Sequence, residues 1–272
     1  MSTVLTIAGF DPSSGAGVTA DLAVFAAHGL FGTSCITALT VQNTLGVAAV
    51  HPVAGDVVRA TLEHLWVDVP PVGIKIGMLG TAECVKAVVG FLDGLGEARP
   101  MVVLDPVLRS TSGKALLDEG GVALMRDELL PLVDWATPNV AELGVLAGKA
   151  EPGREEIAGM GRELQAGVPG LGLLVTGGHL ERPDDLLLMP FDGVKPGGQF
   201  WLSGRRVETT ATHGTGCALS SAFLSRMVNG DGPLEAARGA KHYVAEAMRR
   251  AVPIGHGHGP MAHLWPLAGL VR

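Results

Sequence analysis

The sequence predicts an α/β protein with a mostly parallel central sheet and helices on both of its faces. Three observations indicate this class. Short apolar runs such as residues 4–8 and 171–175 are flanked by glycine, as buried parallel strands often are. Longer segments with helical spacing separate these runs. Finally, 47% of the 272 residues are apolar and only 17% are charged, which supports a sizeable core.

The elements are predicted in chain order from these patterns. The first half predicts strands over 4–8, 36–42, 47–51, 73–76 and 102–104, and helices over 16–28, 56–66 and 82–92. The second half predicts strands over 134–137 and 171–176, and helices over 122–130, 140–146, 154–165, 215–228 and 234–249. Consecutive strand-like runs without helices between them predict antiparallel pairing at one sheet edge, over 186–189, 199–202 and 206–208. Because no long linker or repeat interrupts this pattern, we expect a single domain over residues 1–272.

The composition excludes several classes of protein. A net charge of −7 argues against a nucleic-acid binder. Mean hydropathy is high at +0.34, but no run of about 18 uncharged apolar residues is present, so we expect no membrane span. Residues 1–4 carry no basic group, and we expect no secretory leader. An odd count of three cysteines suggests free thiols in a reducing compartment, and we expect a cytoplasmic protein.

A glycine-rich loop follows the first predicted strand. It runs over residues 9–17, and Asp21 lies one turn into the helix that follows. Glycine lets the backbone approach a ligand closely, and ligands of open α/β sheets bind beyond the carboxyl ends of the strands. The alternative is an ordinary flexible turn with a capping serine.

A second glycine-rich turn opens a late helix, in the sequence His213-Gly214-Thr215-Gly216-Cys217. Exposed N–H groups and the positive end of the helix dipole favour an anion site there. The turn is not a Walker A loop, because the ending Gly-Lys-Ser/Thr is absent. We expect the same field to lower the pKa of the Cys217 thiol, so that it can act as a base. The alternative is a small buried cysteine.

Polar residues also follow three other predicted strands. Asp105 and Glu142 would meet at the carboxyl edge of the sheet, where carboxylate oxygens suit a phosphate-bound Mg²⁺. Asn139 and Glu142 also have the spacing of a helix capping box, which is the alternative interpretation. Gln42 ends a strand and offers a donor and an acceptor suited to the edge of a heterocycle, unless it is an ordinary turn amide.

Taken in order, these motifs resemble the hydroxymethylpyrimidine/phosphomethylpyrimidine kinases of the ribokinase-like superfamily. The resemblance extends over nearly the whole chain. Its motifs here are IAGFDPSSGAG (7–17), TSCITALTVQNT (33–44), KIGMLG (75–80), LDPV (104–107), TPNVAEL (137–143), TGGHL (176–180), THGTGCALSSA (212–222) and the terminal Gly-His-Gly-Pro (257–260).

The resemblance implies a three-layer sandwich with a small β flap, and a homodimer. It implies phosphorylation of 4-amino-5-hydroxymethyl-2-methylpyrimidine and then of its monophosphate, with ATP and Mg²⁺, in thiamin biosynthesis. The pyrimidine pocket would comprise Gly9, Asp21, Gln42, Met78 and Val107. The anion hole would comprise Gly214, Thr215, Gly216 and Cys217, with Cys217 in place of the aspartate base of most superfamily kinases. The remaining roles would be Mg²⁺ binding by Asp105 and Glu142, and nucleotide binding by Asn139, Thr176 and Gly178.

Two departures from the family pattern stand out. Many members carry lysine where this chain has Thr176. Residues 108–113 also differ from the sequence that is common in the family, although Arg109 could serve there as a hydrogen-bond donor to phosphate. The alternatives are a pyridoxal or pyridoxine kinase of the same superfamily, and a catalytically silent pyrimidine-binding module. His213 is interpreted as a structural turn residue, and the histidines near the C-terminus, His256, His258 and His263, are not expected to bind metal.

Overall fold

In the computed structural model, the described residues (1–110, 113–191, 195 and 197–269) form a nine-stranded sheet in the order β3-β2-β1-β4-β5-β6-β7-β8-β9. The strands are β1 (Thr3–Phe10), β2 (Phe31–Asn43), β3 (Gly46–Pro52), β4 (Gly73–Ile76), β5 (Met101–Leu104), β6 (Trp135–Ala136), β7 (Gly172–Val175), β8 (Asp185–Leu188) and β9 (Gln199–Leu202). Every neighbouring pair from β2 to β7 is parallel. β3 pairs antiparallel with β2, and β8 and β9 continue the other edge antiparallel.

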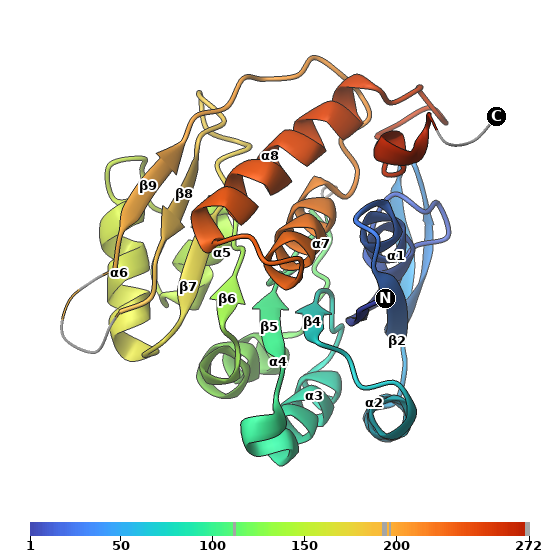
Figure 1. The fold of residues 1–272 in the computed structure, drawn as a ribbon, viewed down its shortest axis with the longest axis vertical. Coiled ribbons are helices and arrows are strands. Elements are labelled where there is room, and N and C mark those ends of the chain that lie inside the picture. The colour runs from blue at the N-terminus through green and yellow to red at the C-terminus, as the bar shows by residue number, and fades with distance from the viewer. Residues whose placement is uncertain (111–112, 192–194, 196, 270–272) are drawn as a thin grey trace.

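Helices cover both faces of this sheet, as Figure 1 shows. One face carries α1 (Gly17–Ala27), α7 (Thr215–Val228) and α8 (Pro233–Arg249). The other carries α2 (Gly55–Asp68), α3 (Ala82–Leu95), α4 (Glu119–Leu124), α5 (Val140–Leu146) and α6 (Ile157–Gly167). Short helical turns are Gly96–Ala98, Met125–Leu129, Leu130–Leu132 and Trp265–Leu267.

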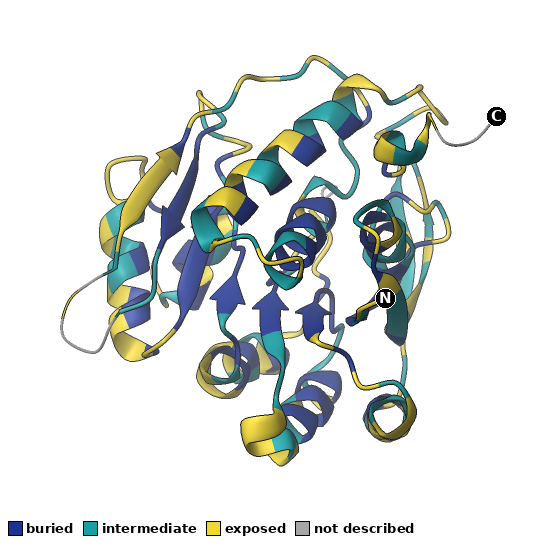
Figure 2. Cartoon of the chain, in the orientation of Figure 1, coloured by how far each residue is buried: buried dark blue, intermediate teal, exposed yellow. Residues whose placement is uncertain are grey.

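Alternation along each strand separates the core into two apolar layers. Leu5 and Ile7 of β1 pack with α2 and α3, whereas Val4 packs with α1 and α7. Successive side chains of a strand point to opposite faces, so a strand buried on both sides is apolar throughout. Figure 2 shows the resulting pattern, with buried central strands and an exposed β9 at the sheet edge.

The β flap forms where β2 continues past the end of β1. Phe10, the last residue of β1, pairs with Leu39 across a register shift, and β2 then runs on to Asn43 beside β3. The extension carries Gln42 past the end of β1, where it pairs with Val47 of β3. The predicted mostly parallel sheet, its helical layers and its flap are therefore confirmed.

One predicted strand is wrong. Residues 206–208 form no strand, because other groups hold this segment. The Arg206 guanidinium donates hydrogen bonds to the carbonyl oxygens of Gly178 (3.3 Å) and Leu180 (2.6 Å), and the backbone of Gly204 donates to Asp184 Oδ1 (3.0 Å). Separately, none of the helices in the described part of the chain has the length and apolar character needed to cross a lipid bilayer.

Candidate active site

A cavity of about 1350 Å³ opens at the carboxyl ends of the parallel strands. This is the position where ligands bind to open α/β sheets. Nearly all the residues that the sequence indicated line it together, namely Gly9, Gln42, Met78, Asp105, Val107, Asn139, Glu142, Thr176, Gly178, Gly214, Thr215, Gly216 and Cys217. Arg109 lines it as well, and its guanidinium donates to the carbonyl oxygen of Gly113 (3.4 Å).

Asp21 does not line the cavity, which corrects the expectation for this residue. Its side chain is fully buried one layer behind the cavity wall. There the carboxylate accepts hydrogen bonds from Thr6 Oγ1 (2.6 Å), Ser221 Oγ (2.8 Å) and Lys75 Nζ (2.9 and 3.1 Å). Asp21 of α1 therefore acts on the cavity only through its neighbours.

Lys75 is the buried cation of this layer, and sequence reasoning missed it. Its Nζ also lies 3.9 Å from Asp105 Oδ2. Burial alone would lower the pKa of Lys75, but the carboxylates of Asp21 and Asp105 outweigh burial and hold the pKa above its ordinary value. A lysine in the middle of the apolar run 73–76 was the available signal, since buried lysines are rare unless paired.

The start of α7 packs tightly against the glycine loop that follows β1. Gly214 adopts a left-handed conformation (φ 78°), and a Cβ there would overlap the carbonyl oxygen of Gly15. Glycine is therefore required at position 214 for both reasons. Backbone N–H groups in the first turn of a helix lack partners within that helix, so this turn presents donors and a positive dipole end to the cavity.

Cys217 lies in this first turn, half-buried in the cavity wall. The expectation that the helix end lowers its pKa is wrong. Loss of water around the sulfur raises the pKa of Cys217 to about 12; the Lys75 ammonium opposes this rise, and the carboxylates of Asp105 and Asp21 reinforce it. The resting thiol is therefore neutral at pH 7.

Asp105 and Glu142 are two cavity carboxyls whose pKa values lie above the ordinary range. Burial raises the pKa of Asp105, although Lys75 opposes the shift. Burial, followed by the nearby charge of Asp105, raises the pKa of Glu142 to about 8. Glu142 also closes the capping box of α5, because its Oε2 accepts from the Asn139 backbone while Asn139 Oδ1 accepts from the Glu142 backbone, both at 2.9 Å. The capping interpretation is thus confirmed, and it leaves Glu142 in the cavity wall.

The two carboxyls of Asp105 and Glu142 are too few to coordinate a metal ion by themselves, but they fit a Mg²⁺ ion that is also bound by substrate phosphates. Within the described residues, no group of three or more His, Cys, Asp or Glu side chains is arranged to hold a metal ion. Mg²⁺ is commonly bound through one or two carboxylates together with substrate phosphates and water. Asp105 and Glu142 supply such a donor set beside the first turn of α7.

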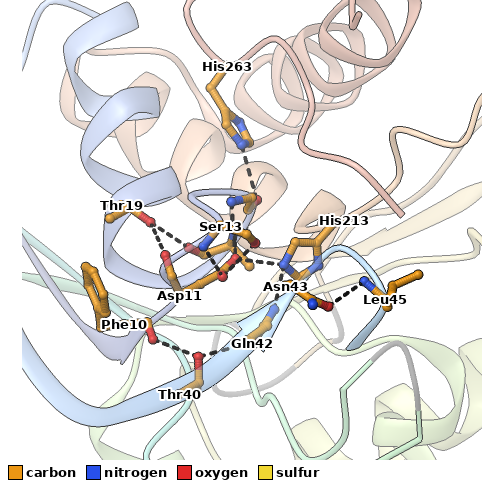
Figure 3. Close-up of polar contacts among 12 residues, drawn as sticks. Phe10, Asp11, Ser13, Thr19, Thr40, Gln42, Asn43, Leu45, His213 and His263 are labelled. Atoms are coloured by element: carbon orange, nitrogen blue, oxygen red, sulfur yellow. Dashed lines mark hydrogen bonds and ion pairs between the residues drawn. The ribbon is translucent and has the colours of Figure 1, made fainter. Parts of the chain in front are cut away.

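Asp11, His213 and Gln42 form a polar network at the flap end of the cavity (Figure 3). His213 Nε2 lies 2.7 Å from Asp11 Oδ2 and 2.8 Å from the Gln42 carboxamide. Asp11 also accepts from Ser13, Gly15 and Ala16. Hydrogen bonds from His213 and Ser13 lower the pKa of Asp11 below its ordinary value, overcoming the opposing effect of burial. His213, predicted as a structural turn residue, forms a β-bridge with Pro260 directly before the turn, and it also contacts the predicted Gln42.

The opposite end of the cavity is rich in basic residues. Arg205, Arg206, Arg238 and Lys241 line it, close to Thr176 and Gly178. Lys241 is engaged with Asp185 Oδ2 and the carbonyl oxygen of Pro183, both at 2.7 Å. Sequence reasoning missed these residues, because they lie on a late loop and on α8 without a recognisable spacing. They supply positive charge near Thr176.

The histidines near the C-terminus hold loops in place. His263 Nε2 lies 3.2 Å from the carbonyl oxygen of Gly15, and His258 Nδ1 lies 2.9 Å from Thr212 Oγ1. The backbone of His256 donates to Thr44 Oγ1 (3.3 Å). The terminal segment therefore joins the glycine loop, the flap and the turn before α7.

Comparison with known proteins agrees with this geometry. The profile of the family described as "Phosphomethylpyrimidine kinase" matches residues 11–262. A hydroxymethylpyrimidine/phosphomethylpyrimidine kinase of Rhizobium meliloti is 40% identical over 263 residues, covering 95% of this chain and 96% of its own. The crystal structure of phosphomethylpyrimidine kinase from Clostridium difficile 630 superposes with a TM-score of 0.77 at 33% identity, covering 91% of this chain and 99% of its own.

A pyridoxal kinase structure is also similar. The enzyme from Staphylococcus aureus in complex with AMP-PCP and pyridoxal has a TM-score of 0.83 at 28% identity, covering 97% of this chain and 94% of its own. Both solved structures share the ribokinase-like fold of this chain. The backbone alone therefore does not separate the two substrate classes, whereas the sequence identity favours the pyrimidine kinases.

Proposed function

Because the chain belongs to the phosphomethylpyrimidine kinase family, we propose that its cavity phosphorylates 4-amino-5-hydroxymethyl-2-methylpyrimidine and then its monophosphate, as a step of thiamin biosynthesis. The phosphoryl donor is ATP. One observation carries the proposal: Gln42, which can bind a heterocycle edge, and the first turn of α7, which can bind an anion, line the same cavity.

The two ends of the cavity bind different substrates. Gly9, Gln42, Met78 and Val107 receive the pyrimidine at the flap end. Asn139, Thr176 and Gly178, with the basic residues around them, receive the nucleotide at the other. Between them the backbone N–H groups of Gly214, Thr215 and Gly216 stabilise the transferring phosphoryl group, which is the largest single contribution expected in phosphoryl transfer.

Asp105 and Glu142 hold Mg²⁺ in this proposal. The ion, when bound, neutralises charge on the phosphate oxygens. The support is chemical: two oxygen donors lie beside the anion-binding turn, and Asp105 is close enough to raise the pKa of Glu142. Removal of divalent ions with a chelator should abolish turnover, and added Mg²⁺ should restore it.

Cys217 accepts the proton of the substrate hydroxyl in the first phosphorylation. Since the resting thiol is neutral, it must give up its own proton before it can accept another, and the Lys75 ammonium, which favours the thiolate, assists that loss. The second phosphorylation starts from a phosphate oxygen that is already ionised, so no base is needed there.

Product analysis tests the function directly. The purified chain is incubated with ATP, Mg²⁺ and either the hydroxymethylpyrimidine or pyridoxal, and the mono- and diphosphate products are separated. The proposal expects both pyrimidine products and a much lower rate with pyridoxal. Faster turnover of pyridoxal would favour the second candidate, which the higher TM-score of the pyridoxal kinase supports. Binding of the pyrimidine without turnover would indicate a silent binding module.

We also propose a homodimer formed through the flap. Leu39, Val41 and Leu45 are 50%, 52% and 69% exposed, and they lie beside the edge strand β3. Exposed apolar clusters next to an unpaired sheet edge commonly mark interfaces. The support for a cytoplasmic location is that all three cysteines are unpaired. Sedimentation of wild-type protein and of Val41→Lys tests the dimer, which should dissociate in the variant.

A further inference from the structure

The Gln42 carboxamide lies between two polar side chains, with Thr40 on one side and His213 on the other (Figure 3). One of its terminal atoms is 2.8 Å from His213 Nε2, and the other is 3.2 Å from Thr40 Oγ1. A carboxamide has one donor end and one acceptor end, so the partners on each side determine which end belongs where.

His213 requires an acceptor. Asp11 is an ionised carboxylate that only accepts hydrogen bonds, and its Oδ2 lies 2.7 Å from His213 Nε2. The hydrogen on Nε2 therefore points toward Asp11, and Nε2 keeps no lone pair for a donor from Gln42. The Gln42 atom beside it must be the oxygen, which shares the same N–H.

Thr40 leads independently to the same orientation. Its hydroxyl has one hydrogen, and the carbonyl oxygen of Phe10 lies 2.9 Å away as the nearer acceptor. With that hydrogen donated to Phe10, the Thr40 oxygen can only accept from Gln42. Figure 3 draws the amide nitrogen toward His213; the neighbours on both sides require the reverse. Oε1 then faces His213, and the Nε2 group of Gln42 faces Thr40.

We propose that Asp11 and His213 are positioning residues that hold the Gln42 carboxamide in this orientation and thereby set the pose of the aminopyrimidine ring. The inference rests on the proposed function. A 4-aminopyrimidine edge presents an amino donor next to the ring acceptor N3, and a glutamine amide can bind such an edge with two hydrogen bonds. With Oε1 beside His213, the amino group binds on the His213 side, and N3 binds on the Thr40 side.

This orientation directs the reacting group toward the anion site. The hydroxymethyl group is attached to the carbon next to the amino-bearing carbon, so it also lies on the His213 side. His213 is followed directly by Gly214 and the first turn of α7. A reversed amide would turn the ring and carry the hydroxymethyl group toward Thr40. The same arrangement disfavours pyridoxal, because an aldehyde next to its hydroxymethyl group offers no donor to Oε1.

The test compares two variants on three substrates. His213→Met removes the N–H donor and retains an unbranched side chain, whereas His213→Gln retains an N–H group near the position of Nε2. The substrates are the hydroxymethylpyrimidine, its analogue without the 4-amino group, and its analogue with C–H in place of N3. Thermal denaturation and the KM for ATP serve as controls for folding and for the nucleotide end.

The expected pattern is a specific coupling between His213 and the amino group. In wild type and His213→Gln, loss of either hydrogen-bonding group lowers kcat/KM about 10- to 100-fold. His213→Met lowers kcat/KM for the full substrate by a similar factor with the KM for ATP unchanged. In His213→Met, further loss of the amino group costs less than about fivefold, while loss of N3 still costs the full factor because Thr40 remains.

Two results would overturn the inference: wild-type kcat/KM in His213→Met, or amino and N3 penalties that are the same in His213→Met as in wild type. If His213→Met does not fold, His213→Asn replaces it, since its shorter amide does not reach the position of Nε2. These outcomes are separate from the proposed function, which is tested by the products that wild-type protein forms from the pyrimidine and from pyridoxal.

Discussion

Lys75 Nζ lies 2.9 Å from Asp21 Oδ2, and neither side chain is exposed to solvent. The same ammonium lies 3.9 Å from Asp105 Oδ2 in the wall of the cavity. One buried cation therefore faces two carboxylates from two different elements, α1 and the turn after β5. Charges taken out of water are tolerated only when they are paired and hydrogen-bonded, so this layer depends on all three groups.

Replacing Lys75 with methionine should destabilise the fold strongly. The variant leaves Asp21 and Asp105 without their cation, and breaking a buried pair on one side typically costs about 3–5 kcal/mol. The double variant Lys75→Met/Asp21→Asn removes one negative charge as well and should recover most of that loss. The free energy of unfolding from denaturant titration measures both. Lys86→Met on the exposed face of α3 is the matched control, and a single variant no less stable than this control would contradict the pairing argument.

Cys217→Ala should separate the two phosphorylations. If the sulfur accepts the hydroxyl proton, its loss lowers the rate of the first step by about 10²–10⁴-fold. The second step uses an ionised phosphate and should change far less. Assays started separately from the hydroxymethylpyrimidine and from its monophosphate give the two rates. Equal losses in both would leave Cys217 with a role in the anion site alone.

The Cys217 thiol should react slowly with alkylating agents. A pKa of about 12 leaves about one thiol in 10⁴ ionised at pH 8, and only the thiolate is nucleophilic. Because the deprotonated fraction rises tenfold per pH unit below the pKa, the rate should climb steadily across the alkaline range. Peptide mapping after iodoacetamide treatment measures the extent of alkylation at Cys217, and the Cys217→Ser variant serves as the unreactive control. Rapid modification at pH 7 would show that the helix field outweighs burial after all.

Glu142→Gln should stabilise the fold in alkali while impairing catalysis. The folded-state pKa of about 8 lies above the ordinary value of 4.5, so the fold prefers the protonated carboxyl. Wild type therefore loses stability as the pH rises from about 4.5 through 8, whereas the glutamine variant, which can still accept from Asn139, does not titrate. The difference in melting temperature between the variant and wild type should therefore increase in favour of the variant by on the order of 10 °C between pH 5 and pH 9.

The catalytic half of that prediction concerns Mg²⁺. A neutral amide is a poorer ligand than a carboxylate, so Glu142→Gln should require more Mg²⁺ for half-maximal turnover. Glu142→Ala, which also removes the cap of α5, separates the two effects because it should be less stable than Glu142→Gln at every pH. An unchanged Mg²⁺ requirement in both variants would remove Glu142 from the metal site.

Several features of the fold followed from short-range patterns. Strands such as 73–76 were readable because a buried parallel strand is a short apolar run, and the glycine turns marked where strands end. The strand over 206–208 was predicted wrongly because alternation along a few residues cannot register that Arg206 is held by the carbonyl oxygens of Gly178 and Leu180. Those contacts join segments that are far apart in the chain.

The amino-acid order by itself determined the class of fold, the cavity edge and the chemical types gathered there, since these depend on periodicity, on glycine and on neighbouring residues. Only the three-dimensional arrangement decided the protonation of Cys217, the withdrawal of Asp21 behind the cavity wall, and the pairing of His213 with Gln42 across 171 positions of chain. The hydration and charge–charge energies of an ionisable side chain depend on the atoms that surround it, and these atoms are brought there by the packing of segments that are distant in the sequence.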